Sequence, residues 1–140
     1  MQMQAKRNKE TIKRFETAIN TADATLAEEL VAQDAPFNTP AFDKPVYGAK
    51  GYLSLVTFLR ASFPDIRWKA EQCAAEGSTV AVRWTCTGTH LGPFMGAAAT
   101  GKKFSVCFMN FYEFNQDGKI IKDTAGTGMI GILQQLHLLK

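Results

Sequence analysis

The sequence of 140 residues has few of the residues that build metal centres and disulfide frameworks. It contains three cysteines, none in a CxxC motif, and two histidines. An odd number of scattered cysteines favours neither a disulfide framework nor a zinc site, so we expect a reducing, cytoplasmic setting. His90 and His137 are far apart, with no carboxylate at ligand spacing, so we expect no metal.

Long apolar runs and strong charge are also missing. No apolar stretch approaches the roughly 20 residues that a membrane-spanning helix needs, and residues 1–10 lack the apolar centre of a signal peptide. The net charge is only +3. Basic residues gather near the N-terminus without interleaved aromatic residues, which is typical of a solvated helix face. We therefore expect no nucleic-acid or membrane partner.

The first half of the chain has the periodicity of amphipathic helices. Apolar residues recur at three- and four-residue spacing over residues 5–20, which predicts a first helix. Thr25 and Glu28 form a capping box for a short second helix. A third apolar stripe covers residues 48–63 and ends before Pro64.

After Pro64 the period changes to the alternation of strands. Strands are predicted at 66–73, 79–90, 103–114 and 119–125, joined by turns at 76–78 and 115–118, and a short amphipathic helix around Ile132 ends the chain. This order indicates an α+β fold in one domain, residues 1–140, with N-terminal helices packed on a curved antiparallel or mixed sheet. Incomplete filling of such a sheet leaves a cone-shaped cavity suited to a ligand.

Two predicted strands supply candidate pocket residues. Trp84 lies on the apolar face of strand 79–90, and Asn110 and Tyr112 are the polar groups on the large apolar face of strand 103–114. Asn110 and Tyr112 are suited to orienting a carbonyl or phenol; the alternative is that they bond to each other or to buried backbone. The opposite face, with Cys107 and Met109, is also apolar, which predicts a homodimer interface.

Six short motifs punctuate the sequence: Phe63-Pro64-Asp65, Ala75-Glu76-Gly77, Gly88-Thr89-His90-Leu91-Gly92, Thr100-Gly101-Lys102, Asp117-Gly118-Lys119-Ile120 and Leu133-Gln134-Gln135-Leu136. In this order, over nearly the whole chain, they resemble the SnoaL-like polyketide cyclase family. The resemblance implies the nuclear transport factor 2-like cone fold, a homo-oligomer and a deep apolar pocket. It also implies ring closure by intramolecular aldol condensation without metal or cofactor, with an acidic side chain as general acid/base.

The sequence departs from the family at the expected acid. Counted without a gap, Lys122, Thr124 and Gly128 stand where the characterised cyclases have a glutamate, a tryptophan and an aspartate. Asp123 is one residue out of phase, which places it on the opposite strand face, and only a bulge would turn it into the pocket. No catalytic residue is therefore assigned from the sequence.

The resemblance adds two pocket positions, Phe15 where a tyrosine is expected and Asn38 in the loop where many relatives have a histidine. His90 is either a pocket acid/base or a strand-ending residue that hydrogen-bonds the loop of residues 92–101. The candidate pocket thus comprises six residues: Phe15, Asn38, Trp84, His90, Asn110 and Tyr112.

Three further predictions concern structure. Asp65 caps the turn between the third helix and the first long strand. Arg83 pairs with Glu71 or Glu113 across the sheet. The cysteines fill the core.

The sequence favours a protein that binds a small, mainly apolar, oxygenated ligand and catalyses cofactor-free cyclisation or isomerisation. The alternative is a non-enzymatic ligand-binding or dimerising module on the same fold. An inward-facing Asp123, or an acid paired with His90, favours the enzyme. An isomerase or epoxide hydrolase of the same fold, which needs a tyrosine with an acid or an Asp-Arg-Asp arrangement, is the weakest hypothesis. Only Arg83 offers the arginine, and no aspartate stands at a suitable strand position beside it.

Overall fold

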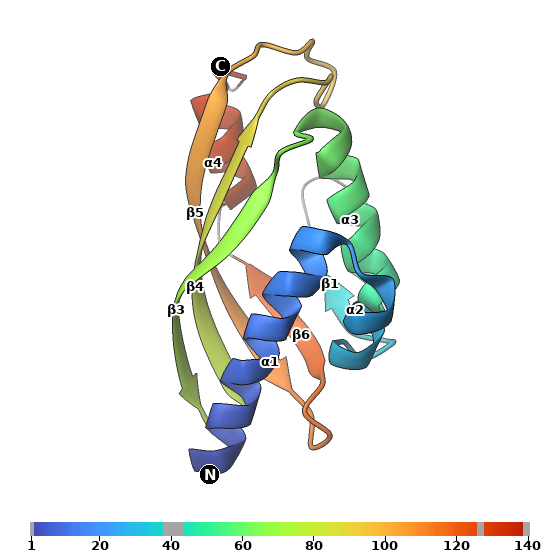
Figure 1. The fold of residues 1–140 in the computed structure, drawn as a ribbon, viewed down its shortest axis with the longest axis vertical. Coiled ribbons are helices and arrows are strands. Elements are labelled where there is room, and N and C mark those ends of the chain that lie inside the picture. Colours follow the sequence, from blue (N-terminus) through green and yellow to red (C-terminus); the bar gives the residue numbers. More distant parts are fainter. Residues whose placement is uncertain (1, 38–43, 126–127, 139–140) are drawn as a thin grey trace.

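A computed structural model describes residues 2–37, 44–125 and 128–138 of the chain. Three helices lie against one side of a twisted antiparallel sheet (Figure 1). They are α1 (Gln2–Thr21), α2 (Ala24–Leu30) and α3 (Gly48–Ser62). The sheet contains β3 (Arg67–Glu76), β4 (Thr79–Thr89), β5 (Lys103–Phe114) and β6 (Ile120–Ala125), in that spatial order. The predicted α+β meander is confirmed.

The helices form where the periodicity predicts them. The apolar stripe of α1 is buried against β3 and β4, while its basic residues are exposed. The predicted capping box of α2 is wrong: the N-cap is Asp23, whose side chain accepts a hydrogen bond from the Leu26 N–H at 3.0 Å. Asp23 takes this role because Ala22, with a φ of 53°, turns the chain immediately before it.

The structure confirms the two predicted turns of the meander and adds a separate short ladder that was not predicted. A two-residue ladder joins β1 (Pro36–Phe37) and β2 (Val46–Tyr47), on either side of the predicted loop. The β3–β4 and β5–β6 turns contain Gly77 and Gly118, both with positive φ. These turns hold neighbouring strands in an antiparallel register, so alternate residues of each strand face the helices.

The strand β6 is shorter than β5 and pairs only with its last five residues. The C-terminal helix α4 (Gly128–Gln135) packs on the remaining part of β5. There the Gln135 side-chain amide accepts from the Ser105 N–H at 2.9 Å and donates to the Ser105 carbonyl at 2.8 Å. Ile132 and Leu136 are buried, as the amphipathic pattern around Ile132 predicts.

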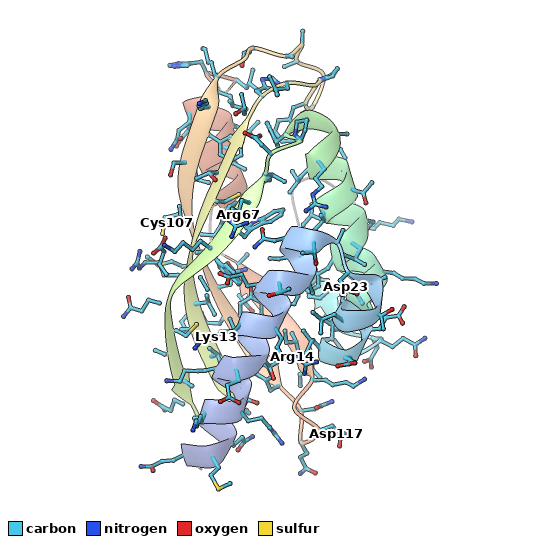
Figure 2. The ribbon with its side chains drawn as sticks, in the orientation of Figure 1. Lys13, Arg14, Asp23, Arg67, Cys107 and Asp117 are labelled. Atoms are coloured by element: carbon cyan, nitrogen blue, oxygen red, sulfur yellow. The ribbon has the colours of Figure 1, made fainter. Side chains whose placement is uncertain are left out.

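The outer face of the sheet corrects two predictions. The Arg83 Nε–H donates to Gln72 Oε1 at 3.5 Å and does not pair with a glutamate among the described residues. Glu71 forms its ion pair with Lys69, and Glu113 forms its ion pair with Lys122, because those lysines are their nearer neighbours. Cys86 is buried in the core, but Cys107 is exposed on this outer face (Figure 2). Met109 and Phe111, which share that face, remain 61% and 57% exposed.

Candidate functional site

A β-bulge turns Asp123 toward the interior of the fold. Ile120 pairs with Phe114, but the next pair along the ladder is Lys122 with Glu113, so Ile121 is an extra residue. Asp123 is therefore opposite Tyr112 and shares its inward face. The ungapped count, which put Lys122 inside and Asp123 outside, is wrong, and the bulge named as the exception is present.

Two side chains hold the Asp123 carboxyl. Tyr52 of α3 donates a hydrogen bond to Oδ2, and Asn110 of β5 donates from Nδ2 to Oδ1 at 2.7 Å. Tyr52 is placed by its position on the buried stripe of α3, and Asn110 by the inward face of β5. The carboxyl is thus fixed between a helix and the sheet, while Asp123 keeps part of its surface accessible.

Aromatic side chains surround this acid. The Phe15 ring lies 4.7 Å from the Tyr52 ring and 5.8 Å from the Tyr112 ring, centroid to centroid. Trp84 Nε1–H donates to the Tyr112 hydroxyl oxygen at 3.0 Å. The Tyr112 hydroxyl hydrogen has no acceptor among the described residues, so it is available to a ligand.

Burial controls the protonation of these groups. Desolvation raises the pKa of Asp123, and the hydrogen bonds from Asn110 and Tyr52 partly oppose this by stabilising the carboxylate. Burial, and then the nearby charge of Asp123, also raise the pKa values of Tyr52 and Tyr112. Both phenols therefore remain hydrogen-bond donors at neutral pH, beside a carboxyl that binds a proton more readily than an exposed one.

The structure brings together four of the six candidate pocket residues, namely Phe15, Trp84, Asn110 and Tyr112. His90 is not among them. It is fully buried against Phe63 and Phe94 of a second core cluster, and its Nδ1 lies 2.9 Å from Thr100 Oγ1 and 3.3 Å from the Thr100 nitrogen. These bonds to the loop after β4 agree with the strand-ending alternative.

Asn38, Gly128 and Asp65 are the remaining positions that the sequence singled out. Asn38 lies outside the described residues, so its place in the pocket stays a prediction. Gly128 is the first residue of α4, beyond the end of β6. Asp65 accepts hydrogen bonds from the N–H and hydroxyl of Thr89, both at 2.7 Å, and so joins the turn before β3 to the end of β4.

Tyr52 was missed because its spacing on α3 is that of a core residue. Its hydroxyl was the only sign that this apolar stripe carried a polar group. The sequence also contains a sign of the bulge, because the apolar doublet Ile120-Ile121 breaks the alternation of apolar and polar residues in this strand.

A separate groove of about 600 Å³ lies between α2 and the start of α3. Glu28, Lys50 and Lys119 give it polar walls, and none of the predicted pocket residues lines it. Among the described residues, no group of three or more histidine, cysteine, aspartate or glutamate side chains is placed to hold a metal ion. No helix in the described part of the chain is long and apolar enough to cross a membrane.

Helices packed on one face of a curved antiparallel sheet, with an inward-facing acid among aromatic residues, define the class of α+β cone proteins. The chain belongs to the SnoaL-like polyketide cyclase family, whose model matches residues 9–136. No curated protein matches it.

Solved structures support this assignment. The chain is similar to IdmH, a proposed polyketide cyclase from Streptomyces antibioticus, with 29% identity, coverage of 93% of this chain and 98% of that one, and a TM-score of 0.80. AclR, a proposed hydroxylase from Streptomyces galilaeus, is 25% identical, with coverage of 97% and 88% and a TM-score of 0.79. TsrD from Streptomyces laurentii, 20% identical over 95% and 96% of the chains with a TM-score of 0.80, shares the fold.

Proposed function

We propose that this protein is a cofactor-free acid–base catalyst of the cyclase or isomerase type, acting on a small, mainly apolar, oxygenated ligand. The observation that carries the proposal is the inward-facing Asp123, hydrogen-bonded by Tyr52 and Asn110. A carboxyl whose pKa is raised by burial is suited to taking a proton from carbon and returning it.

In the proposed reaction, ionised Asp123 removes a proton from the carbon beside a substrate carbonyl. The Tyr112 hydroxyl donates a hydrogen bond to the carbonyl oxygen as negative charge develops on it. The hydrogen bond from Trp84 to the Tyr112 oxygen favours this donation by drawing electron density from the phenol. The enolate carbon then attacks a second carbonyl, or is reprotonated elsewhere, and Asp123 returns the proton.

The non-enzymatic alternative has one observation in its favour. Both Asp123 oxygens already accept a hydrogen bond from the protein, as they do when a carboxyl only stabilises a fold. The two functions differ in whether a bound ketone exchanges its α-protons.

Proton exchange on 2-tetralone in D2O, followed by NMR, separates these functions without knowledge of the natural substrate. We expect the wild-type protein to exchange the protons beside the carbonyl faster than buffer does, and Asp123→Asn to lose this acceleration. His90→Leu is the matched control, because it also alters a buried polar residue but lies in the other core cluster. Binding of 2-tetralone without exchange supports the non-enzymatic module and contradicts the proposal.

We also propose that the protein is a homodimer in a reducing, cytoplasmic setting. Support for the dimer is the exposure of Met109 and Phe111 on the outer face of β5, since large apolar patches on a sheet usually contact a partner. The three free thiols are consistent with the compartment. Gel filtration at micromolar concentration should give a dimer, and Met109→Lys a monomer; a monomeric wild-type protein would contradict the interface.

A further inference from the structure

Asn110 has one polar atom that the protein leaves unused. Its side-chain oxygen, Oδ1, is buried and accepts no hydrogen bond from any described residue. Asn110 as a whole is only 9% exposed. Buried polar atoms in folded proteins nearly always have a partner, so an unpaired acceptor on the inward face of β5 points to a group that the protein alone does not supply.

The orientation of the Asn110 amide follows from its neighbour. An ionised carboxylate can only accept hydrogen bonds, so the amide must turn its NH2 group to Asp123 and its oxygen away. The ionised form is also the one that takes a proton from carbon. The state of the site that is ready to react is therefore the state with a free acceptor at Asn110.

None of the described neighbours of Asn110 donates a hydrogen bond to Oδ1, including the Tyr112 hydroxyl two residues along the same strand face. Across the strands Asn110 is paired with Val82 of β4 and Ala125 of β6, whose side chains are apolar. The hydroxyl of Tyr52 is committed to Asp123, and the indole N–H of Trp84 is committed to Tyr112. The acceptor is left for a ligand.

We propose that Asn110 selects ligands that carry a hydroxyl group, phenolic or enolic, on an apolar ring, and that Oδ1 accepts the hydrogen bond from this hydroxyl. The inference rests on the proposed function, because it assumes that the ligand binds beside Asp123. It assigns separate roles to neighbouring residues of β5: Tyr112 donates to a carbonyl oxygen, whereas Asn110 accepts from a hydroxyl.

A pair of ligands in which a hydroxyl group is replaced by its methyl ether tests this role, and the Asn110→Leu variant separates the loss of the donor from the added methyl group. We expect the wild-type protein to bind 2-naphthol roughly tenfold or more tightly than 2-methoxynaphthalene, as measured by calorimetry, because only the naphthol satisfies the buried acceptor. In Asn110→Leu, which has a similar volume and no polar atom, this ratio should fall to about one. A wild-type protein that binds both compounds equally, or neither, overturns the proposal.

Tyr52→Phe is the matched control, since it removes the other hydrogen bond to the Asp123 carboxyl and leaves Asn110 in place. Because this variant raises the pKa of Asp123, the two proteins are compared at a pH at which Asp123 is ionised in both. If Asn110 is the acceptor, the naphthol preference of this variant stays at the wild-type ratio. If Asp123 is the acceptor, the freed lone pair strengthens naphthol binding and raises the ratio, which contradicts the inference.

A crystal of the wild-type protein soaked with 2-naphthol gives a result even if Asn110→Leu fails to fold. We expect the naphthol oxygen at roughly 3 Å from Asn110 Oδ1, and any other position overturns the assignment. The exchange of 2-tetralone protons, which needs no hydroxyl group, tests the proposed function separately. Exchange without a naphthol preference refutes only the role of Asn110, whereas the preference without exchange refutes only the catalysis.

Discussion

Replacement of Asp123 by asparagine should separate catalysis from stability. The substitution removes the carboxyl that we propose transfers the proton, but it keeps the shape of the side chain. The oxygen of the introduced amide can still accept from Tyr52, and the Asn110 amide can turn so that its own oxygen accepts from the introduced NH2 group. The hydrogen bonds around the site are therefore conserved in number, and any loss of activity reflects the missing carboxyl.

The expected loss of activity follows from the role of the group. General acid–base catalysis contributes roughly 10² to 10⁴ in rate, so the Asp123→Asn variant should slow 2-tetralone exchange by that factor, about 2.7 to 5.5 kcal/mol in activation free energy. The assay is the first-order loss of the α-proton NMR signals, corrected for exchange in buffer.

Whereas the activity of the Asp123→Asn variant should fall, its stability at neutral pH should rise. Because burial raises the pKa of Asp123 above its value in the unfolded chain, ionisation is less favourable in the folded protein. The wild-type protein is thus penalised as the pH rises through the folded-state pKa, and this penalty is absent below the unfolded-state pKa. We expect Asp123→Asn to unfold at higher urea concentration than wild type at pH 7, with the difference shrinking toward pH 3. A variant less stable than wild type at every pH, or one that retains full exchange activity, would refute this reasoning.

Three other variants test neighbouring parts of the site. Tyr52→Phe removes a hydrogen bond that lowers the pKa of Asp123, so the acid limb of the pH–rate profile of exchange should move to higher pH; an unchanged profile argues against the contact. Deletion of Ile121 removes the bulge but leaves Asp123 opposite Tyr112, so the rate of 2-tetralone exchange should stay within about threefold of wild type. Loss of exchange in this variant would show that the bulge has another role. His90→Leu leaves the Thr100 N–H and hydroxyl without their partner, so the free energy of unfolding measured in urea should fall by about 1–3 kcal/mol. The rate of exchange per folded molecule should be unchanged, and a reduced rate would favour His90 as a pocket residue.

The structural role of His90 illustrates what a motif does and does not reveal. The glycine-rich segment after β4 predicted a loop, and His90 stood at its start as a candidate for either chemistry or architecture. Its contacts with Thr100 place it in the architecture because the loop returns to the end of β4 and meets the imidazole there. Sequence order shows only that the two residues lie ten positions apart.

The sequence alone determined the elements and their faces. Helical and strand periods are local properties, so the stripe on α1, the stripe on α3 and the alternation of β4 and β5 were all predictable. Placing Trp84, Asn110 and Tyr112 on inward faces followed directly from the two-residue period. The family motifs extended this to the order of the whole chain.

Only the tertiary structure decided the register of the last strand and the partners of its acid. Whether Ile121 continues the ladder or bulges out depends on how β6 pairs with β5, and a one-residue difference reverses every side chain beyond it. Tyr52 reaches Asp123 across 71 positions of sequence, because the fold brings the buried stripe of α3 to the inward face of β6. Long-range packing of this kind has no local period, so the sequence pointed to the fold while the structure located the acid.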